Sequence, residues 1–271
     1  MSTSDQASVR AVLILKADQL AAAALQGYAQ KTFPSAHVIL VGSVDAAQLA
    51  LAARPADLVI VGMDSRYEGD VLSLLAHCAG HPTRPPHILA LVDRHETHLL
   101  AMLRILEIEG VFDPIAEPPS QLETALVNVA AGRRYWSASL TAHMQSGGPT
   151  NSLYRSLTAF EQLVLVVIGD GCDDAVAARE LDVSPATIST VRRNLHRKLR
   201  VQHRGELIRI AAQHGFVRFT PHGVLRQGYT TLAAIHRHRH RTRAVETPVV
   251  MPVASPAVMR PAAPEVALPA A

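Results

Sequence analysis

The chain has 271 residues, with 26 Lys and Arg against 23 Asp and Glu, a formal net charge of +3 and two cysteines. At about 100–200 residues per domain this length predicts two domains, and no apolar run reaches the roughly 18 residues that cross a membrane. Because residues 1–10 are polar and Cys78 and Cys172 are far apart, we expect a cytoplasmic protein without signal peptide, disulfide framework or zinc site.

Charge is unevenly distributed along the chain. Residues 1–150 contain 10 basic and 14 acidic side chains, a net charge of −4, whereas residues 151–220 contain 10 and 7, a net charge of +3. Residues 221–271 contain 6 basic and 2 acidic side chains, a net charge of +4. The C-terminal half is therefore expected to attract polyanions.

Residues 1–132 alternate short β-branched runs with longer segments rich in Ala and Leu, a pattern that predicts parallel strands connected by helices. The predicted strands are residues 12–15, 37–41, 58–61, 87–92 and 110–112. The predicted helices are residues 18–31, 46–54, 69–79, 96–107 and 120–131. Runs such as VLIL and LVIV are almost uniformly apolar, as expected for strands buried on both faces. Five such units predict an α/β domain with a doubly wound, five-stranded parallel sheet of the flavodoxin-like type.

A segment with small and turn-forming residues follows this domain. Residues 146–152 read SGGPTNS, and we predict a flexible linker over residues 133–156. Arg133, Arg134 and Trp136 lie just before this stretch, where they are within reach of either domain or form the cation-rich end of a helix.

Residues 157–220 predict an all-α domain, in which local signals place the first three helices. Thr158 and Glu161 have the spacing of a capping box, and Gly169 with Gly171 supplies a stop signal. Asp173 or Asp174 then caps a short second helix that ends near Leu181. Ser184 followed by Pro185 begins a third helix, because Ser is a good N-cap and Pro fits the first helical position.

The third helix sorts its residues onto two faces. Ile188, Val191, Leu195 and Leu199 fall on one stripe, which is expected to pack inward. The other side is polar, and no acidic residue interrupts it from 187 to 200. This pattern predicts a helix that reads a DNA groove, rather than a merely solvated basic surface. The predicted DNA-binding residues are Thr187, Ser189, Thr190, Arg192, Arg193, Asn194, Arg197, Lys198 and Arg200.

Residues 221–271 differ in composition from both domains. Residues 236–243 read HRHRHRTR, in which the arginines are predicted to add sequence-independent phosphate contacts. The alternating histidines are interpreted as solvated rather than as metal ligands. Residues 244–271 are mainly Pro, Ala and Val, which predicts a disordered or extended tail.

Residues 157 to about 214 resemble the LuxR-type helix-turn-helix of NarL/FixJ response regulators. The chain has the family's residue at Leu157, Thr158, Glu161, Leu165, Gly171, Ala178, Leu181, Ser184, Thr187, Asn194, Arg197, Lys198, Leu199 and Val201. The resemblance implies that the third helix enters the major groove, with Ser189, Thr190 and Arg193 facing bases, and that a fourth helix at about 204–214 provides a dimer contact. Asp174 and Ala175 stand where the family usually has Asn and Lys, which predicts weaker contacts to the DNA backbone.

Residues 9–132 resemble the receiver domain of the same family, but without its chemistry. A working receiver needs an acidic pair after the first strand and an Asp after the third, because carboxylates hold Mg²⁺ beside the phosphoryl acceptor. In this chain Lys16 and Ala17 stand at the positions of the acidic pair, and Gly62 stands at the position of the acceptor Asp. The family's Ser/Thr after the fourth strand corresponds to Val92, and Pro114 lies in or beside the place of its Lys after the fifth strand. Asp18 and Asp64 are the candidates for a displaced acidic site, and we interpret them as surface or helix-capping residues. Lys16 is hypothesised to replace the positive charge of the metal.

We therefore predict an atypical response regulator: a sequence-specific DNA-binding transcriptional regulator that acts without aspartyl phosphorylation, as a dimer. Its predicted partners are double-stranded DNA, a second copy of the chain and a regulatory protein or small ligand at the receiver-like domain, with no membrane, metal or cofactor. No P-loop, GxGxxG, HExxH or GxSxG motif is present, so no enzymatic activity is expected. The alternative is a helix-turn-helix that contacts another regulator or RNA polymerase rather than DNA.

Overall fold

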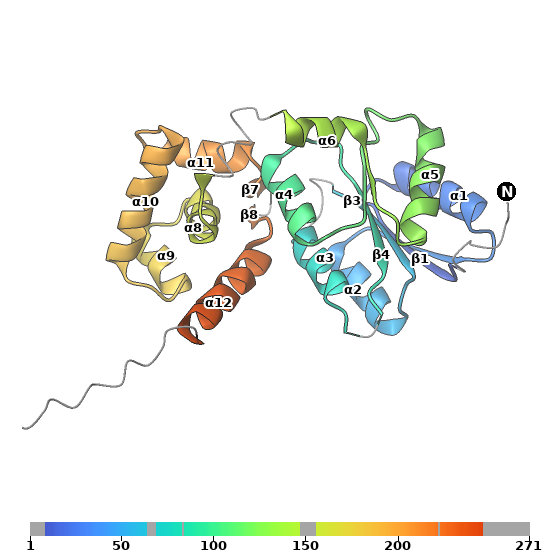
Figure 1. Ribbon diagram of the computed structural model, residues 1–271, viewed down its shortest axis with the longest axis horizontal. Helices are drawn as coiled ribbons and strands as arrows, with labels where there is room; N and C mark the ends of the chain where they lie inside the picture. Colours follow the sequence, from blue (N-terminus) through green and yellow to red (C-terminus); the bar gives the residue numbers. More distant parts are fainter. Residues whose placement is uncertain (1–8, 64–68, 83, 147–155, 222, 246–271) are drawn as a thin grey trace, which may run out of the picture.

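The computed structural model describes residues 9–63, 69–82, 84–146, 156–221 and 223–245, and for residues 238–245 it describes the backbone only. A parallel sheet flanked by helices forms one part of the molecule, and a group of helices forms the other (Figure 1). The predicted division into an α/β and an all-α part is confirmed.

The sheet has six parallel strands in the order β2-β1-β3-β4-β5-β6. Their bounds are β1 Ala11–Leu15, β2 His37–Val41, β3 Leu58–Gly62, β4 His87–Leu91, β5 Gly110–Phe112 and β6 Tyr135–Trp136. Every residue of β1, β3 and β5 is buried, as the uniformly apolar runs predicted. The five predicted strands are confirmed to within a residue or so at their ends.

The sixth strand corrects the predicted five-stranded sheet and the predicted linker over residues 133–156. Tyr135 and Trp136 pair with Gly110 and Val111 of β5, so the chain continues the sheet after the last predicted helix. Helix α6, Ala138–Gln145, follows and buries Leu140 completely. Two residues are too few to show the alternation that marks a strand in a sequence. The SGGPTNS stretch itself lies mostly outside the described residues.

Helices cover both faces of the sheet. The bounds are α1 Gln19–Thr32, α2 Val44–Ala53, α3 Val71–Ala79, α4 Thr97–Ile105 and α5 Pro119–Ala130. Buried residues of α1 and α5 form one core with one face of the sheet, and those of α2, α3 and α4 form a second core on the other face. This is the doubly wound arrangement that the alternating pattern predicted.

The all-α part contains the four predicted helices: α8 Ala159–Gly169, α9 Asp174–Glu180, α10 Pro185–Leu199 and α11 Arg204–Gln213. Thr158 and Glu161 form the predicted capping box, in which Thr158 N–H donates to Glu161 Oε2 at 2.7 Å. Asp173 and Ser184 cap α9 and α10 through their side chains. Local sequence signals therefore placed each of these starts correctly.

The helical part extends beyond residue 220, which corrects the predicted domain boundary at 221. An antiparallel hairpin, β7 Val217–Thr220 and β8 Gly223–Arg226, leads into helix α12, Tyr229–Val245. Leu232 of α12 is buried in the core, and the ring of His236 stacks on Phe160 of α8 with centroids 4.7 Å apart. The backbone of the HRHRHRTR tract is thus helical, although the side chains of Arg239, Arg241 and Arg243 lie outside the description. The predicted tail beyond Val245 also lies outside it.

The two parts share one hydrophobic core. A single buried cluster runs from α3 and α4 through Phe216 and Leu232 to α8. His98 of α4 is fully buried at this junction, where its Nε2 lies 3.0 Å from the carbonyl oxygen of Gln227. Gly228 N–H donates to Asp70 Oδ2 at 2.9 Å, and burial raises the pKa of Asp70. These contacts fix the helical part against the sheet domain in the described structure.

Candidate nucleic-acid interface

Helix α10 forms the outer edge of the helical part. Ser184 Oγ accepts from Thr187 N–H at 3.1 Å, and Pro185 occupies the first turn. The helix ends at Leu199 and is followed by its C-cap residue, Arg200, whose φ of 54° places it in the left-handed region. It packs against α8, α9 and α11, and Figure 1 shows it at the end of the molecule away from the sheet.

The predicted division of α10 into two faces is confirmed. Ile188, Val191, Leu195 and Leu199 are all buried against the neighbouring helices. The side chains of Thr187, Thr190, Arg193, Arg197 and Arg200 are exposed, whereas those of Ser189, Arg192, Asn194 and Lys198 are half-buried. The exposure of the polar side chains thus decreases from the outermost line of the helix toward its flanks.

Arg192 does not have the free guanidinium group that its position predicted. Its Nε donates to both carboxylate oxygens of Asp174, at 3.0 and 3.1 Å, and its Nη2 donates to Asp174 Oδ2 at 2.9 Å. Asp174 is the first residue of α9, so the pair joins the second and third helices. This bidentate pairing neutralises a cation that was predicted to reach a phosphate, because the departure at position 174 places a carboxylate within its reach.

Lys198 is also held inside the domain. Its Nζ donates to Glu161 Oε2 at 2.7 Å and to the carbonyl oxygen of Ser156 at 2.8 Å. Burial alone would raise the pKa of Glu161, but hydrogen bonds from Lys198 and from Thr158 outweigh it and lower the pKa below its ordinary value. Lys198 therefore ties α10 to the start of α8, and its predicted contact to DNA remains a prediction.

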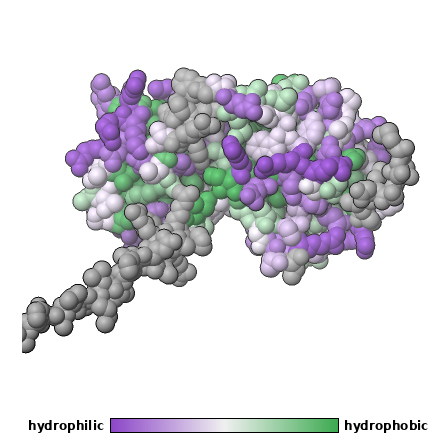
Figure 2. Space-filling model, viewed as in Figure 1, coloured by the Kyte–Doolittle hydropathy of each residue, from purple (hydrophilic) through white to green (hydrophobic). Residues whose placement is uncertain are grey.

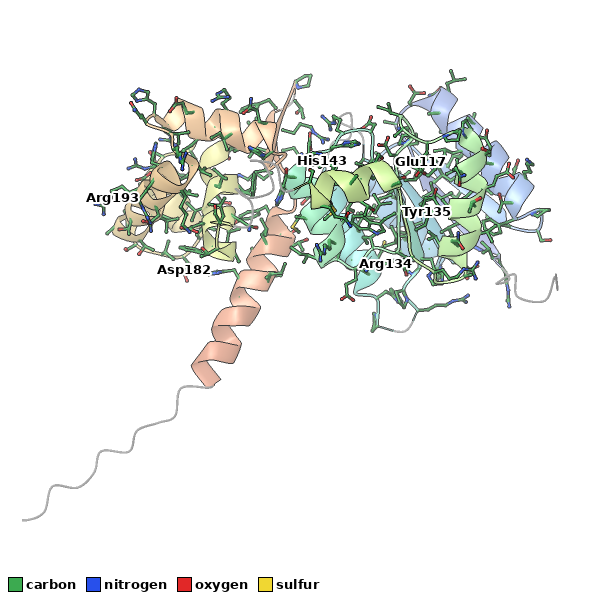
Figure 3. The ribbon with its side chains drawn as sticks, turned by 45° about the horizontal axis from the view of Figure 1, so that its top comes forward. Glu117, Arg134, Tyr135, His143, Asp182 and Arg193 are labelled. Atoms are coloured by element: carbon green, nitrogen blue, oxygen red, sulfur yellow. The ribbon has the colours of Figure 1, made fainter. Side chains whose placement is uncertain are left out.

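Three exposed arginines remain on α10 without a carboxylate partner among the described residues: Arg193, Arg197 and Arg200. Arg193 Nη2 lies 3.3 Å from the Oγ1 atom of Thr190, whose hydroxyl donates to the Ala186 carbonyl at 2.9 Å. Figure 3 shows Arg193 pointing outward from the helix, and Figure 2 shows hydrophilic side chains gathered over this end of the molecule. The surface offers planar hydrogen-bond donors to an anion or to the edge of a guanine.

The neighbouring helix α9 is less basic. Ala175 is exposed, and Val176 is 36% exposed, so the second and third residues of the helix present apolar surface. The cation that the resemblance would place near this turn is absent from the sequence. Of these two helices, α10 therefore carries most of the basic residues.

At the carboxyl edge of the sheet, the described residues that stand at the predicted receiver positions carry no carboxylate. Lys16 and Ala17 follow β1 directly, Gly62 is the last residue of β3, and Val92 is fully buried directly after β4. None of these side chains is a carboxylate, so the residues do not fit a Mg²⁺ ion.

The position after β5 holds an acid that the sequence comparison did not single out. Asp113, not Pro114, follows Phe112 directly, and its Oδ2 accepts from Ser139 Oγ and lies 2.8 Å from His95 Nε2. Burial alone would raise the pKa of Asp113, but hydrogen bonds from Ala116 N–H, His95 and Ser139 outweigh it and lower the pKa. Its Oδ1 accepts from Ile115 and Ala116 N–H within the loop between β5 and α5, and its Oδ2 connects that loop to His95 and Ser139.

The remaining ionisable candidates have structural roles in the described part of the chain. Asp18 Oδ1 accepts from Ala21 N–H at 3.0 Å and so caps α1, as predicted, whereas Asp64 lies outside the described residues. No cluster of three or more His, Cys, Asp or Glu side chains that could hold a metal ion occurs among the described residues. Cys78 and Cys172 are free, and burial raises the pKa of both thiols to about 11. None of the described helices is long and apolar enough to span a bilayer.

The architecture is therefore a doubly wound sheet domain joined to a helix-turn-helix domain with an outward basic helix. Residues 155–211 match the family model described as "Bacterial regulatory proteins, luxR family". That segment is a LuxR-type regulatory domain, as the resemblance in the sequence predicted. No curated protein sequence matches the chain significantly.

Solved structures of response regulators share this fold. RcsB from Salmonella enterica serovar Typhimurium, bound to promoter rprA in the presence of phosphomimetic BeF3-, is 21% identical with a TM-score of 0.53. The match covers 74% of this chain and 98% of that one. A second structure, of two RcsB dimers bound to two parallel DNAs, is 19% identical with a TM-score of 0.51, covering 76% and 98%. At these identities the comparison establishes the fold.

Proposed function

We propose that this protein is a sequence-specific DNA-binding transcriptional regulator that works as a dimer and without aspartyl phosphorylation. The observation that carries the proposal is the outer face of α10. Arg193, Arg197 and Arg200 are exposed there, without a carboxylate partner in the described part of the chain, while the opposite stripe of the helix is buried. This is the arrangement by which a recognition helix enters a major groove.

The position of α10 supports direct access to DNA. The sheet domain and the helical part meet at one contact. The sheet domain contributes α3 and α4, and the helical part contributes Phe216, Gln227 and α12. Helix α10 lies on the far side of the helical part, so the sheet domain leaves its outer face open (Figure 1). The described conformation therefore requires no separation of the domains before the helix meets a duplex.

Phosphorylation independence is supported by the residues at the carboxyl edge of the sheet. Lys16, Ala17 and Gly62 supply no carboxylate for Mg²⁺ and no phosphoryl acceptor where the fold would position them. A switch driven by an aspartyl phosphate lacks its chemical group at these positions. The domain is instead proposed to act through its fixed contact with the helical part and through dimerisation.

Dimerisation is proposed because one copy presents a single short basic helix. The matched RcsB structure contains two dimers bound to two parallel DNAs, and this describes RcsB. In this chain Leu99, Met102 and Leu103 of α4 are buried core residues, as expected for most of that helix, whereas Ile105 is 48% exposed. Sedimentation equilibrium of the full chain tests the proposal, and a monomer at micromolar concentration would contradict it.

DNA binding is tested by selection of duplexes from a random pool with the full-length protein, followed by gel-shift titrations of the selected sequence at several salt concentrations. Replacing a bidentate guanine contact costs about 1–3 kcal/mol, so R193A should lower the affinity for the selected duplex roughly 5- to 150-fold. Arg54→Ala, an equal change of charge at an exposed site on the sheet domain, should leave the affinity unchanged.

The alternative is a helix-turn-helix that contacts another regulator or RNA polymerase. The pairing of Arg192 with Asp174 favours it, because that pair removes a cation from the flank of α10. Under this alternative, no duplex is enriched from the pool and R193A has no effect on the remaining weak, salt-dependent binding. That outcome would favour protein binding over DNA binding as the function of the helix-turn-helix.

A further inference from the structure

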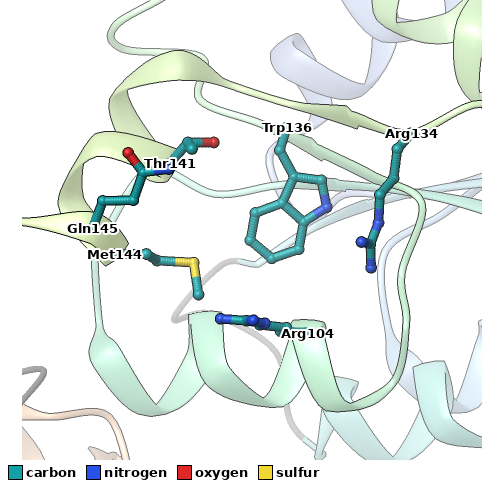
Figure 4. Close-up of a pocket in the computed structure, with 6 residues that line it drawn as sticks. All are labelled: Arg104, Arg134, Trp136, Thr141, Met144 and Gln145. Carbon is teal, nitrogen blue, oxygen red and sulfur yellow. The ribbon is translucent and has the colours of Figure 1, made fainter.

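We propose that a pocket between α4, β6 and α6 binds a small planar anion, a ring system that carries a carboxylate or phosphate group. The cavity measures about 390 Å³ and lies at the edge of the sheet (Figure 4). This volume is within the roughly 300–1,000 Å³ of pockets that hold small molecules. Its lining residues are Arg104, Arg134, Trp136, Thr141, Met144 and Gln145.

Two arginines give the pocket its charge. Arg104 of α4 and Arg134, directly before β6, are both exposed, and no carboxylate in the described ranges pairs with either. The neighbouring Arg133 differs, because its Nε donates to Asn128 Oδ1 at 2.9 Å. Two guanidinium groups at one cavity repel each other, and an anion between them removes that repulsion. Guanidinium groups match carboxylate and phosphate oxygens in geometry.

Trp136 supplies a planar wall. Its Nε1–H donates to the Ile108 carbonyl at 3.2 Å, which holds the indole in place and occupies its N–H group, so the ring lines the cavity chiefly as an apolar surface. Figure 4 shows the side chains of Arg104 and Arg134 on two sides of this ring, with the thioether of Met144 beside it. An aromatic face and a polarisable sulfur favour a flat apolar body over a spherical ion. The pocket thus pairs a stacking surface with two cations.

Neutral polar groups complete the lining. Thr141 and Gln145 of α6 stand one helical turn apart, and both line the cavity. They add donors and acceptors for a substituent on the ring, without negative charge that would oppose an anion. Among the described residues, the lining therefore contains two cations and no acid.

The site is separate from the DNA-facing helix and from the carboxyl edge of the sheet. It depends on β6 and α6, which the linker prediction had missed, and it does not rest on DNA binding. Helix α4 connects it to the rest of the molecule, because the helix begins at Thr97 beside the buried His98 and ends at Ile105 beside the pocket. Nine residues of helix span about 13 Å, so the site and the domain contact share one rigid element.

The chain offers a direct reporter, since Trp136 is its only tryptophan. Full-length protein is titrated with two matched pairs of probes: cinnamate against neutral cinnamamide, and adenosine 5′-monophosphate against adenosine. Binding is measured by calorimetry and by the change in Trp136 fluorescence. At least one anion should bind with a dissociation constant below about 1 mM and at least tenfold more tightly than its neutral partner. Which pair responds distinguishes a carboxylate ligand from a phosphate ligand.

Matched variants test the residues. Arg104→Gln and Arg134→Gln should each weaken binding of the responding anion about tenfold, whereas Arg133→Gln should leave it unchanged. All three sites are exposed, so the folded state is expected to survive, and far-ultraviolet circular dichroism checks this. The proposal is overturned if neither anion binds at millimolar concentration, if the neutral partners bind equally well, or if the Arg104 and Arg134 variants bind as the wild type does.

Discussion

The imidazole ring of His98 stacks on the ring of Phe216, with centroids 4.2 Å apart and planes inclined by 21°. His98 belongs to α4 of the sheet domain and Phe216 to the segment between α11 and β7, so this contact joins the two parts of the molecule. The backbone repeats the connection, because His98 N–H donates to the His214 carbonyl at 3.0 Å. Both side chains are fully buried.

This contact predicts that stability falls in mild acid. Burial lowers the pKa of His98 to about 4, although the hydrogen bond to the Gln227 carbonyl acts in the opposite direction. Below about pH 6.5 the unfolded chain therefore binds a proton that the folded chain does not. Between pH 7 and pH 5 the free energy of unfolding should fall by about 2 kcal/mol from this group alone.

His98→Gln isolates the effect, because the amide can still donate to Gln227 and does not titrate. Urea denaturation at pH 7 and pH 5 should show that the free energy of unfolding falls less for the variant than for the wild type. Burial also lowers the pKa of His214, which adds to the loss, while the raised pKa of Asp70 acts in the opposite sense at lower pH. Equal acid losses in the two proteins would exclude His98 as the source.

Two glycines of the helical part should respond oppositely to alanine. Gly215 has a φ of 80°, and an added Cβ would lie 2.6 Å from Glu96 Oε2 and 3.0 Å from Glu96 Cβ. Gly215→Ala should therefore destabilise the domain contact by more than about 1 kcal/mol. Gly205 lies in α11 with nothing within 4 Å of the added Cβ, so Gly205→Ala should stabilise the protein by about 0.5–1 kcal/mol. Thermal unfolding of both variants checks the pair, and a shared direction would contradict it.

Asp174 is predicted to reduce DNA affinity by holding Arg192. Asp174→Asn removes the charge that binds the guanidinium group and also removes an acid from the start of α9. The variant should bind the selected duplex several-fold more tightly. The plot of log binding constant against log salt concentration should also become steeper by about 0.9, the value for one added phosphate contact. Asp45→Asn, an exposed acid on α2, is the control for net charge. If both variants behave alike, the gain comes from overall charge and not from the release of Arg192.

Acetyl phosphate with Mg²⁺ should leave the mass of the intact protein unchanged. The side chains at the carboxyl edge of the sheet include Lys16, Ala17 and Gly62, which offer no acceptor where the fold would place one. Intact-mass spectrometry under conditions that phosphorylate a competent receiver measures this directly. A gain of one phosphoryl group that peptide mapping assigns to Asp64 would overturn phosphorylation independence.

Much of the fold was predictable because its signals are local. Thr158, Asp173 and Ser184 each cap a helix through a side chain that accepts from a backbone N–H three residues ahead, and such pairings can be recognised in a sequence. The uniformly apolar strands and the buried stripe of α10 follow from periodicity in the same way. The exposed position of Arg193 followed from its angle on that helix.

The pairings of Arg192 with Asp174 and of Lys198 with Glu161 were not predictable, because each joins residues of different helices. The same holds for the sixth strand, whose two residues become a strand only by pairing with β5. The junction of His98 with Phe216 spans more than a hundred residues of chain, and no local pattern marks either partner.

The sequence by itself determined the order of elements, their caps and the basic face of α10, since these depend on contacts between neighbours in the chain. Tertiary structure alone decided which cations stay free, how the helical part docks on α4, and that Arg104, Arg134 and Trp136 meet at one cavity. The physical reason is that charge pairing and cavity formation depend on distances in space, which chain spacing does not fix across separate elements.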